Sequence, residues 1–264
     1  MNKKFSLYSL IVLIAIMVIT SHSSVNSQRD TLWTTERIKE TTIIKSRHER
    51  NKKNTKKVKR NNIVVHPVLS IVNPESYFPI GPLFINLSEG LRSACTASVI
   101  NTANGNIGLT SAHCLTTHDP NDLIFSPGFD YGKEGPLGYI SVEEFAIPYT
   151  HLKDPYDDDY ALVKFAFIDP NGENMRLQDY TGGLGWRFDV GNNTLTKVLG
   201  YPSSGDLVNC SKDASGAPML FQYNRNEDSG YVYTVHEGYI NSTRDSIAPI
   251  WDEPIFLGLL LKLS

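Results

Sequence analysis

Cysteine and long apolar runs are both scarce in this 264-residue chain. Its three cysteines are too few for a small scaffold held together by many disulfides. The longest nearly unbroken apolar run has about fifteen residues, fewer than the roughly 20 that a membrane-spanning helix needs. Hydrophobic residues nevertheless make up 41% of the chain and charged residues 20%, so the chain can bury a core and is not wholly disordered. Its length suits one large domain or two of ordinary size.

Basic residues are scarce beyond residue 60. Residues 1–60 hold 14 Lys/Arg and 4 Asp/Glu, whereas residues 61–264 hold 11 Lys/Arg and 24 Asp/Glu, so the two parts carry net charges of +10 and −13. Nucleic-acid binding needs a basic surface that neutralises phosphates. The acidic body therefore argues against a nucleic-acid partner, while nothing in the sequence indicates an oligomeric state.

The N-terminus is typical of a secretory signal peptide. Two lysines precede the apolar run Phe5–Ile19, and small polar residues follow it. We interpret residues 1–24 as a cleaved signal, with a retained signal-anchor as the alternative. Export to the extracellular space is expected, with no stable membrane association after cleavage.

A basic segment, residues 25–60, separates this signal from the body. It ends in Lys56-Lys57-Val58-Lys59-Arg60, which offers dibasic cleavage sites to a processing protease. We interpret it as the propeptide of a zymogen; a solvated, disordered charged tail is the alternative. Four glycosylation sequons are compatible with export, although each alone is a weak signal. They begin at Asn86, Asn192, Asn209 and Asn241.

The remaining chain, residues 61–264, has an all-β pattern. Short β-type runs alternate with clusters of Gly, Pro, Asn and Asp, and no segment shows a helical period for more than two turns. Such spacing predicts a sandwich or barrel. The Gly- and Asp-rich stretch Asn171–Asn193 is the expected interdomain connection. The predicted strands are Leu83–Leu87, Cys95–Ile100, Ile107–Thr110, Tyr139–Ile147, Tyr160–Phe165, Lys197–Tyr201, Pro218–Tyr223, Tyr231–Tyr239 and Phe256–Leu263.

Three segments carry the side chains that nucleophilic catalysis needs. His113 follows a β-type run, Asp159 directly precedes another, and Ser215 opens the sequence Ser-Gly-Ala-Pro. A serine hydroxyl is a poor nucleophile at neutral pH unless an imidazole accepts its proton. The imidazole in turn needs a carboxylate that fixes its tautomer and stabilises its cation. The alternatives are a structural histidine, a solvated acidic loop and an ordinary turn serine.

These segments resemble motifs of the chymotrypsin/trypsin-like serine proteases. Thr110-Ser-Ala-His113-Cys114 resembles Thr-Ala-Ala-His-Cys, Asp159-Tyr-Ala-Leu-Val resembles Asp-hydrophobic-Ala-Leu, and Ser215-Gly-Ala-Pro resembles Ser-Gly-Gly-Pro. Val198-Leu-Gly-Tyr-Pro202 resembles the Gly-Tyr-Pro strand of compact, V8-like members. The resemblance extends from Leu83 to the C-terminus.

The resemblance implies two six-stranded antiparallel β-barrels, at about residues 61–170 and 180–264. Only 56 positions separate Asp159 from Ser215, which is short for animal trypsins and leaves room for an abbreviated second barrel. Cys95 lies 19 positions before Cys114, as the histidine-loop disulfide of the family requires. Two buried free thiols are the alternative. Cys210 is then a free thiol, a cysteine that pairs between molecules, or a cysteine whose partner has been lost.

The implied activity is that of a secreted serine endopeptidase that forms an acyl-enzyme. Ser215 would attack the scissile carbonyl, His113 would act as base and then acid, and Asp159 would orient His113. The N–H groups of Asp213 and Ser215 would line the oxyanion hole. Proteins or peptides are the expected substrates. No metal or organic cofactor is expected, since the sequence lacks Cys/His spacings typical of metal ligands.

The chain departs from the family pattern just before Ser215. Asp213 replaces the usual Gly of the oxyanion hole, and Ala214 replaces the Asp that receives the new N-terminus in trypsin-like zymogens. Loss of one oxyanion donor costs roughly 100–1000-fold in rate. A catalytically impaired homologue that serves as a binding or regulatory module is therefore the main alternative, and an esterase on the same fold is a third.

The resemblance implies that Asn209, His236 and Gly238 help to determine substrate specificity. Asn209 occupies the place, six positions before Ser215, where trypsin-like members carry an Asp, so a preference for Lys or Arg is not supported. Val235-His236-Glu237-Gly238 resembles the Ile-His-Trp-Gly stretch of V8-like glutamyl endopeptidases, whose His helps to hold an acidic P1 side chain. The alternative is that His236 is a histidine of the pocket wall or barrel core.

We predict that the secreted protein begins near Asn61, because a protease that recognises paired basic residues would cut after Arg60. N-terminal sequencing of protein from the culture medium measures this directly. A dominant secreted species that begins near Ser24 would show that the basic segment is retained.

Overall fold

The computed structural model describes seven stretches of the chain. They are residues 78–86, 92–129, 133–191, 194–201, 214–224, 229–240 and 245–264, and all belong to one compact unit. The predicted signal peptide and basic propeptide lie outside the described residues, as do Asn209, Cys210 and Asp213. The sequon asparagines Asn192 and Asn241 lie outside them too, whereas Asn86 ends a strand.

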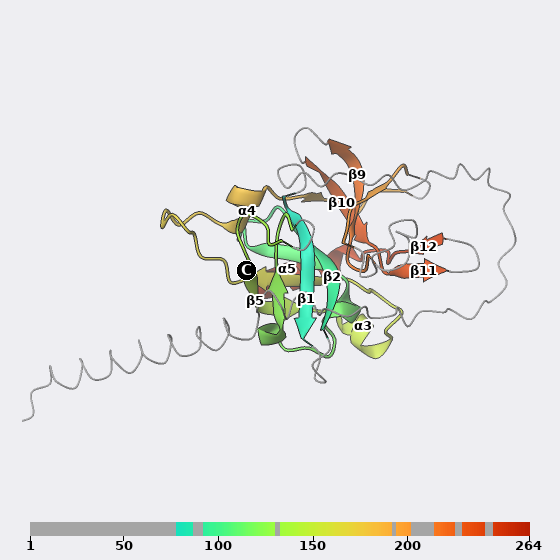
Figure 1. Cartoon of the computed structure of the whole chain (residues 1–264). Helices are drawn as coiled ribbons and strands as arrows, with labels where there is room; N and C mark the ends of the chain where they lie inside the picture. The colour runs from blue at the N-terminus through green and yellow to red at the C-terminus, as the bar shows by residue number, and fades with distance from the viewer. Residues whose placement is uncertain are drawn as a thin grey trace, which may run out of the picture. The chain divides into compact units, whose positions relative to one another are not determined.

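Six strands close into an antiparallel barrel in the first half of the domain (Figure 1). Its order is β1-β2-β3-β6-β5-β4, so each strand pairs with two neighbours. Inward-facing apolar side chains fill it, and Phe125 and Phe165 stack there with ring centroids 4.6 Å apart. The predicted first barrel is confirmed. The strands are β1 (Ile80–Asn86), β2 (Arg92–Val99), β3 (Ile107–Thr110), β4 (Leu123–Phe125), β5 (Ile140–Ala146) and β6 (Ala161–Phe165).

The second half forms an open sheet and a hairpin over the residues described. The sheet has the order β7-β10-β9-β8, with β7 parallel to β10, and β11 pairs with β12 alone. Figure 1 shows β9 and β10 in orange to red. A closed second barrel therefore stays a prediction. The strands are β7 (Gly185–Trp186), β8 (Lys197–Val198), β9 (Pro218–Asn224), β10 (Ser229–Val235), β11 (Gly238–Ile240) and β12 (Asp245–Ile247).

The predicted strand Phe256–Leu263 is wrong: these residues belong to helix α5 (Glu253–Leu263). The side chain of Asp252 caps the helix by accepting a hydrogen bond from the N–H of Ile255 at 3.0 Å. Phe256, Leu259 and Leu263 are buried at spacings of three and four residues, while apolar residues between them, such as Leu261, are exposed. This mixture hid the helical period. The expectation of no helix longer than two turns is wrong for the same reason.

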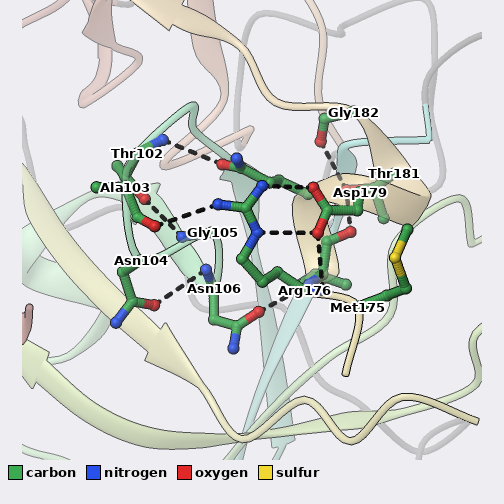
Figure 2. A network of polar contacts seen from close by, with 12 residues as sticks. Thr102, Ala103, Asn104, Gly105, Asn106, Met175, Arg176, Asp179, Thr181 and Gly182 are labelled. Carbon is green, nitrogen blue, oxygen red and sulfur yellow. Dashed lines mark hydrogen bonds and ion pairs between the residues drawn. The ribbon is translucent and has the colours of Figure 1, made fainter. Parts of the chain in front are cut away.

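The stretch Asn171–Asn193 is more ordered than the loop we expected, because it contains α4 (Leu177–Thr181) and β7. Arg176, next to α4, pairs with Asp179 through contacts of 2.8 and 2.6 Å (Figure 2). Its guanidinium also donates to the carbonyl of Ala103 at 3.2 Å, in the turn between β2 and β3. These bonds join the connection to the first barrel.

The remaining corrections are smaller. Only Lys197–Val198 of the predicted strand Lys197–Tyr201 pairs as a strand. The predicted strand Tyr231–Tyr239 divides into β10 and β11 at residues 236–237. Three short helical turns also occur: η2 (Ala112–Cys114), η3 (Pro120–Asp122) and α3 (Tyr149–Lys153). No helix within the described stretches is long and apolar enough to cross a membrane.

Cys95 in β2 and Cys114 in η2 form the expected disulfide, so the free-thiol alternative is wrong. We predict that the double variant Cys95→Ala/Cys114→Ala loses roughly 3 kcal/mol of unfolding free energy, because the loop of about twenty residues is no longer closed in the unfolded chain. Urea denaturation followed by circular dichroism measures the loss. Cys210→Ser is the matched control and should keep the parent's midpoint; an equal loss in the control would contradict the prediction.

Candidate active site

The pairing of β3 with β6 brings His113 and Asp159 together. Thr110 at the end of β3 lies opposite Ala161 at the start of β6. His113 follows Thr110 by three residues on η2, and Asp159 precedes Ala161 by two. Two residues that are 46 positions apart therefore meet at one end of the barrel, as the sequence predicted.

Two hydrogen bonds join these residues. The imidazole Nδ1 of His113 lies 2.6 Å from Oδ2 of Asp159, and the backbone N–H of His113 donates to Oδ1 at 2.8 Å. Asp159 is fully buried, whereas the side chain of His113 is 30% exposed. Since Nδ1 faces the carboxylate, Nε2 is the ring nitrogen left to exchange a proton with another group.

The pair shifts the titration of both groups. Burial alone would lower the pKa of His113, but the hydrogen bond and charge of Asp159, together with the charge of Glu237, outweigh it and raise that pKa above the usual 6.5. Burial alone would raise the pKa of Asp159, but the hydrogen bonds and charge of His113 lower it below its usual value. Asp159 is therefore ionised at neutral pH, where it stabilises the imidazolium of His113.

The three consecutive aspartates have different surroundings. Asp157 is exposed and Asp158 is half-buried. Asp158 takes a left-handed conformation, with φ at 45°, and accepts a hydrogen bond from Oγ1 of Thr150 at 2.5 Å. Asp159 alone of the three points into the interior. A solvated acidic loop accounts for its neighbours but not for Asp159.

His151 is a buried neighbour of the pair that the sequence did not reveal. It lies on α3 with 2% exposure, and its Nδ1 is 3.0 Å from the carbonyl oxygen of Asp157 and 3.9 Å from Oδ1 of Asp159. Its Nε2 lies 3.4 Å from Oγ1 of Thr116. The flanking sequence of His151 resembles no motif, so only the packing of α3 against the Asp159 loop identifies it.

The turn that carries Ser215 binds to the same end of the first barrel. The carbonyl of Ser215 accepts a hydrogen bond from the N–H of Thr96 at 2.8 Å. Thr96 follows the disulfide cysteine Cys95, and its own carbonyl accepts from Oγ1 of Thr110 at 2.7 Å. Strand β2 thus binds the serine turn directly, and the disulfide connects it to the histidine turn.

Gly216 is required by this close approach. Its φ is +80°, and a Cβ there would lie 2.3 Å from the carbonyl oxygen of Thr96 and 2.4 Å from Oγ1 of Thr110. Glycine adopts this conformation without steric cost, and its lack of a Cβ leaves the space that the close contact needs. The Ser-Gly sequence therefore has a steric basis in the contact between the two halves of the domain.

The segment from His236 to Gly238 lies against the serine turn. The carbonyl of His236 accepts hydrogen bonds from the N–H of Gly216 at 2.9 Å and from Oγ of Ser111 at 3.1 Å. The backbone N–H of His236 donates to the carbonyl of Ala217 at 2.8 Å. These bonds connect His236 with the flanks of both Ser215 and His113. His236, Glu237 and Gly238 are all buried.

The ring of His236 is buried, and one of its nitrogens makes no hydrogen bond with the described residues. Among the described residues, no group bonds its Nδ1. Burial, and secondarily the charge of His113, lowers its pKa to about 4, so the imidazole is neutral at neutral pH. The predicted site residues Asn209 and Asp213 lie outside the described residues.

A cavity of about 310 Å³ lies beside this site. It is lined by Tyr156, Asp157, Asp158, Glu237, Ala248, Pro249 and Ile250. The cavity thus separates the loop that leads to Asp159 from the segment that follows His236.

One group of side chains has the composition of a metal site. Ligand atoms of Cys95, His113 and Cys114 lie within 4.8 Å of one another. Metals bind cysteine as the thiolate, and both sulfurs are bonded to each other here. The intact disulfide therefore leaves this group unsuited to hold a metal.

Comparisons with known proteins identify the fold. No protein-family model and no curated protein matches the sequence. Among solved structures, the protease Anisep from Arthrobacter nicotinovorans aligns with a TM-score of 0.60 at 18% identity, covering 72% of this chain and 96% of its own. The thermostable serine protease AL20 from an extremophilic microorganism aligns with a TM-score of 0.59 at 17% identity, and the alignment covers 72% of this chain and 98% of AL20. A Glu endopeptidase aligns with a TM-score of 0.51 at 18% identity, and the alignment covers 73% of this chain and 94% of the endopeptidase.

Proposed function

We propose that this chain, which has the fold of the chymotrypsin-like serine proteases, is a secreted serine endopeptidase. The observation that supports this most directly is the buried carboxylate of Asp159 bonded to Nδ1 of His113. A carboxylate in this position holds the imidazole in the tautomer that accepts a proton at Nε2. The turn of Ser215, bound to the same end of the barrel, supplies the nucleophile.

The proposed reaction has two halves. Oγ of Ser215 attacks the scissile carbonyl carbon while its proton passes to Nε2 of His113. When the tetrahedral intermediate collapses, the C–N bond breaks and His113 returns the proton to the leaving amine. In the second half a water molecule, deprotonated by His113, attacks the acyl ester and releases the carboxylic acid and Ser215.

The N–H groups of Ser215 and Asp213 are the proposed donors to the oxyanion. The N–H of Gly216 cannot take this part, because it donates to the carbonyl of His236. Each such donor contributes roughly 100–1000-fold in rate. The reaction therefore depends on whether Asp213, in place of the usual Gly, presents its N–H to the substrate.

The proposal also covers the export and the maturation of the chain. The signal, residues 1–24, directs export, and removal of residues 25–60 converts the zymogen to its mature form. Proteins or peptides are the substrates. The Ala214 found just before the serine cannot pair with a new N-terminus, so removal of the basic segment would act by uncovering the site.

The active-site proposal predicts that a fluorophosphonate probe labels Ser215 in folded, propeptide-free protein. Ser215→Ala should abolish labelling and lower kcat by about 10⁶-fold, and Asp159→Asn should lower it by about 10⁴-fold. Because the pKa of His113 is raised, kcat/KM should increase with pH through a value above 6.5. Labelling followed by mass spectrometry, and peptide hydrolysis across pH, measure these effects. Persistent failure of the folded chain to react would favour the binding-module alternative.

His236 is the proposed P1 determinant, together with Asn209 and Gly238. Its buried Nδ1 has no hydrogen-bond partner among the described residues, and a Glu endopeptidase is among the proteins of similar fold. Since the pKa of His236 is about 4, the free site offers a neutral imidazole rather than a cation at neutral pH. Recognition of P1 Glu would therefore rest on hydrogen bonding.

We predict that His236→Ala loses selectivity for P1 Glu and keeps some cleavage after apolar residues. Because the pKa of His236 is about 4, the parent's preference should not follow an imidazole titration near pH 6.5. A peptide library with varied P1 residues measures the selectivity. His118→Ala, which changes a histidine outside the site, is the control. Equal Glu selectivity in parent and His236→Ala would point to a small apolar pocket instead.

A further inference from the structure

Helix α3 places a buried histidine against the loop that carries Asp159. His151 is the middle residue of this helix and is only 2% exposed. Polar side-chain atoms at buried positions are in large majority hydrogen-bonded. The partners of its two ring nitrogens therefore indicate what part His151 has in the structure.

The Nδ1 atom of His151 carries a proton in this arrangement. It lies 3.0 Å from the backbone carbonyl oxygen of Asp157. A carbonyl oxygen only accepts hydrogen bonds, so the nitrogen that faces it must be the donor. The same nitrogen lies 3.9 Å from Oδ1 of Asp159, which is too far for a hydrogen bond but close enough for electrostatic attraction. The N–H group thus binds the loop and lies beside the carboxylate.

This contact is made at the carboxylate oxygen that does not bond the ring of His113. Oδ2 of Asp159 lies 2.6 Å from Nδ1 of His113, whereas Oδ1 accepts from the backbone N–H of His113 at 2.8 Å. His151 approaches that same Oδ1. The carboxylate therefore bonds His113 through both oxygens and has a second histidine beside one of them.

The loop between α3 and Asp159 turns tightly. Asp158 takes a left-handed conformation with φ at 45°, which is uncommon for residues other than glycine. The N–H of Tyr160 donates to the carbonyl of Asp158 at 2.7 Å, so the turn closes across Asp159. Thr150, next to His151, bonds the side chain of Asp158 at 2.5 Å. Two adjacent residues of α3 thus hold the loop at the point from which the Asp159 side chain extends.

The other ring nitrogen of His151 faces the turn that carries His113. Nε2 lies 3.4 Å from Oγ1 of Thr116, and that hydroxyl donates to the carbonyl of Ala112 at 2.8 Å. Ala112 directly precedes His113. His151 therefore contacts the loop of Asp159 with one nitrogen and the histidine turn with the other.

We propose that His151 is a positioning residue for Asp159: its Nδ1–H fixes the carbonyl of Asp157 and so keeps the carboxylate where it bonds His113. The proposal rests on the proposed function for its catalytic consequence, because the carboxylate must hold the ring of His113 in the correct tautomer and orientation for proton transfer. A ring that only filled the space could not replace His151, since the contact depends on a donor at the δ position.

The titration of the pair agrees with this assignment. Burial would raise the pKa of Asp159, but the hydrogen bonds and charge of His113, followed by the charge of His151, lower it. Burial would lower the pKa of His113, but the hydrogen bond and charge of Asp159, followed by the charge of Glu237, raise it. His236, with its pKa of about 4, adds no positive charge at neutral pH. The pKa of His113 therefore reports how well the carboxylate of Asp159 is held.

The test is a titration of His113 in variants of the folded chain, followed through its Cε1–H resonance by NMR. His151→Asn places an amide nitrogen at the δ position, where it can replace Nδ1–H, whereas His151→Gln places it at the ε position. His151→Phe fills the space without a donor. The pKa of His113 should fall toward 6.5 in His151→Gln and His151→Phe, and should stay close to the parent's value in His151→Asn.

His118→Phe is the matched control. It makes the same substitution at a partly buried histidine whose charged neighbour is Asp122 rather than Asp159. The pKa of His113 should not change in this variant. An equal fall in His118→Phe and His151→Phe would contradict the inference, because the effect would then not depend on the contact with the Asp159 loop.

Peptide hydrolysis supplies a second measurement. In His151→Gln and His151→Phe, kcat should fall by up to about 100-fold, because a small misplacement of catalytic groups can cost that much. KM should stay close to the parent's value, since His151 makes its polar contacts with Thr116, Asp157 and Asp159, none of which is a proposed specificity residue. His151→Asn should restore most of kcat.

The outcomes separate this inference from the proposed function. An unchanged pKa of His113 in His151→Gln and His151→Phe, or an equal fall in His151→Asn, overturns the inference even where peptide hydrolysis is normal. If His151→Phe does not fold, the comparison of His151→Asn with His151→Gln decides, because the two amides differ mainly in the position of the donor. A selective fall in a chain that hydrolyses no peptide supports the part given to His151 and counts against the protease.

Discussion

The interaction on which the rest of the site depends is the burial of the Asp159 carboxylate against His113. A fully buried charge is tolerated only when it is paired and hydrogen-bonded. The ring and the backbone N–H of His113 supply both needs. These bonds orient the imidazole, raise its pKa and turn Nδ1, rather than Nε2, toward the carboxylate. The barrel makes this possible, because the register of β3 and β6 brings the backbones that carry the two residues to the same end of the barrel.

The second half of the domain is positioned against this pair by backbone groups. Thr96 binds the carbonyl of Ser215, and Gly216 passes so close to Thr96 and Thr110 that a side chain is excluded. His236 bonds to the far side of the same turn. The serine turn therefore lies between a strand of the first barrel and the end of β10. Its position is determined by short-range sterics and hydrogen bonds that a single methyl group at Gly216 would disrupt.

The strands of the first barrel could largely be predicted from the sequence, because short β-type runs there are bounded by Gly, Pro, Asn and Asp residues. The prediction holds for five of the six strands and missed β4, a three-residue strand that is buried throughout. It fails for α5, whose nearly continuous apolar run conceals which residues face the core. It fails also for Asn171–Asn193, where α4 is held by contacts of Arg176 with Asp179 and with the distant turn at Ala103. Local propensity contains no information about such partners.

By itself, the sequence determined the order and spacing of His113, Asp159 and Ser215 and the separation of Cys95 from Cys114, because those properties are written in short motifs. Only the tertiary structure decided which of three adjacent aspartates is buried, why residue 216 is glycine, and that His151 lies beside the pair formed by His113 and Asp159. The physical reason is that burial and electrostatic coupling depend on which distant segments pack together. A carboxylate acts on an imidazole through space, whatever its place along the chain.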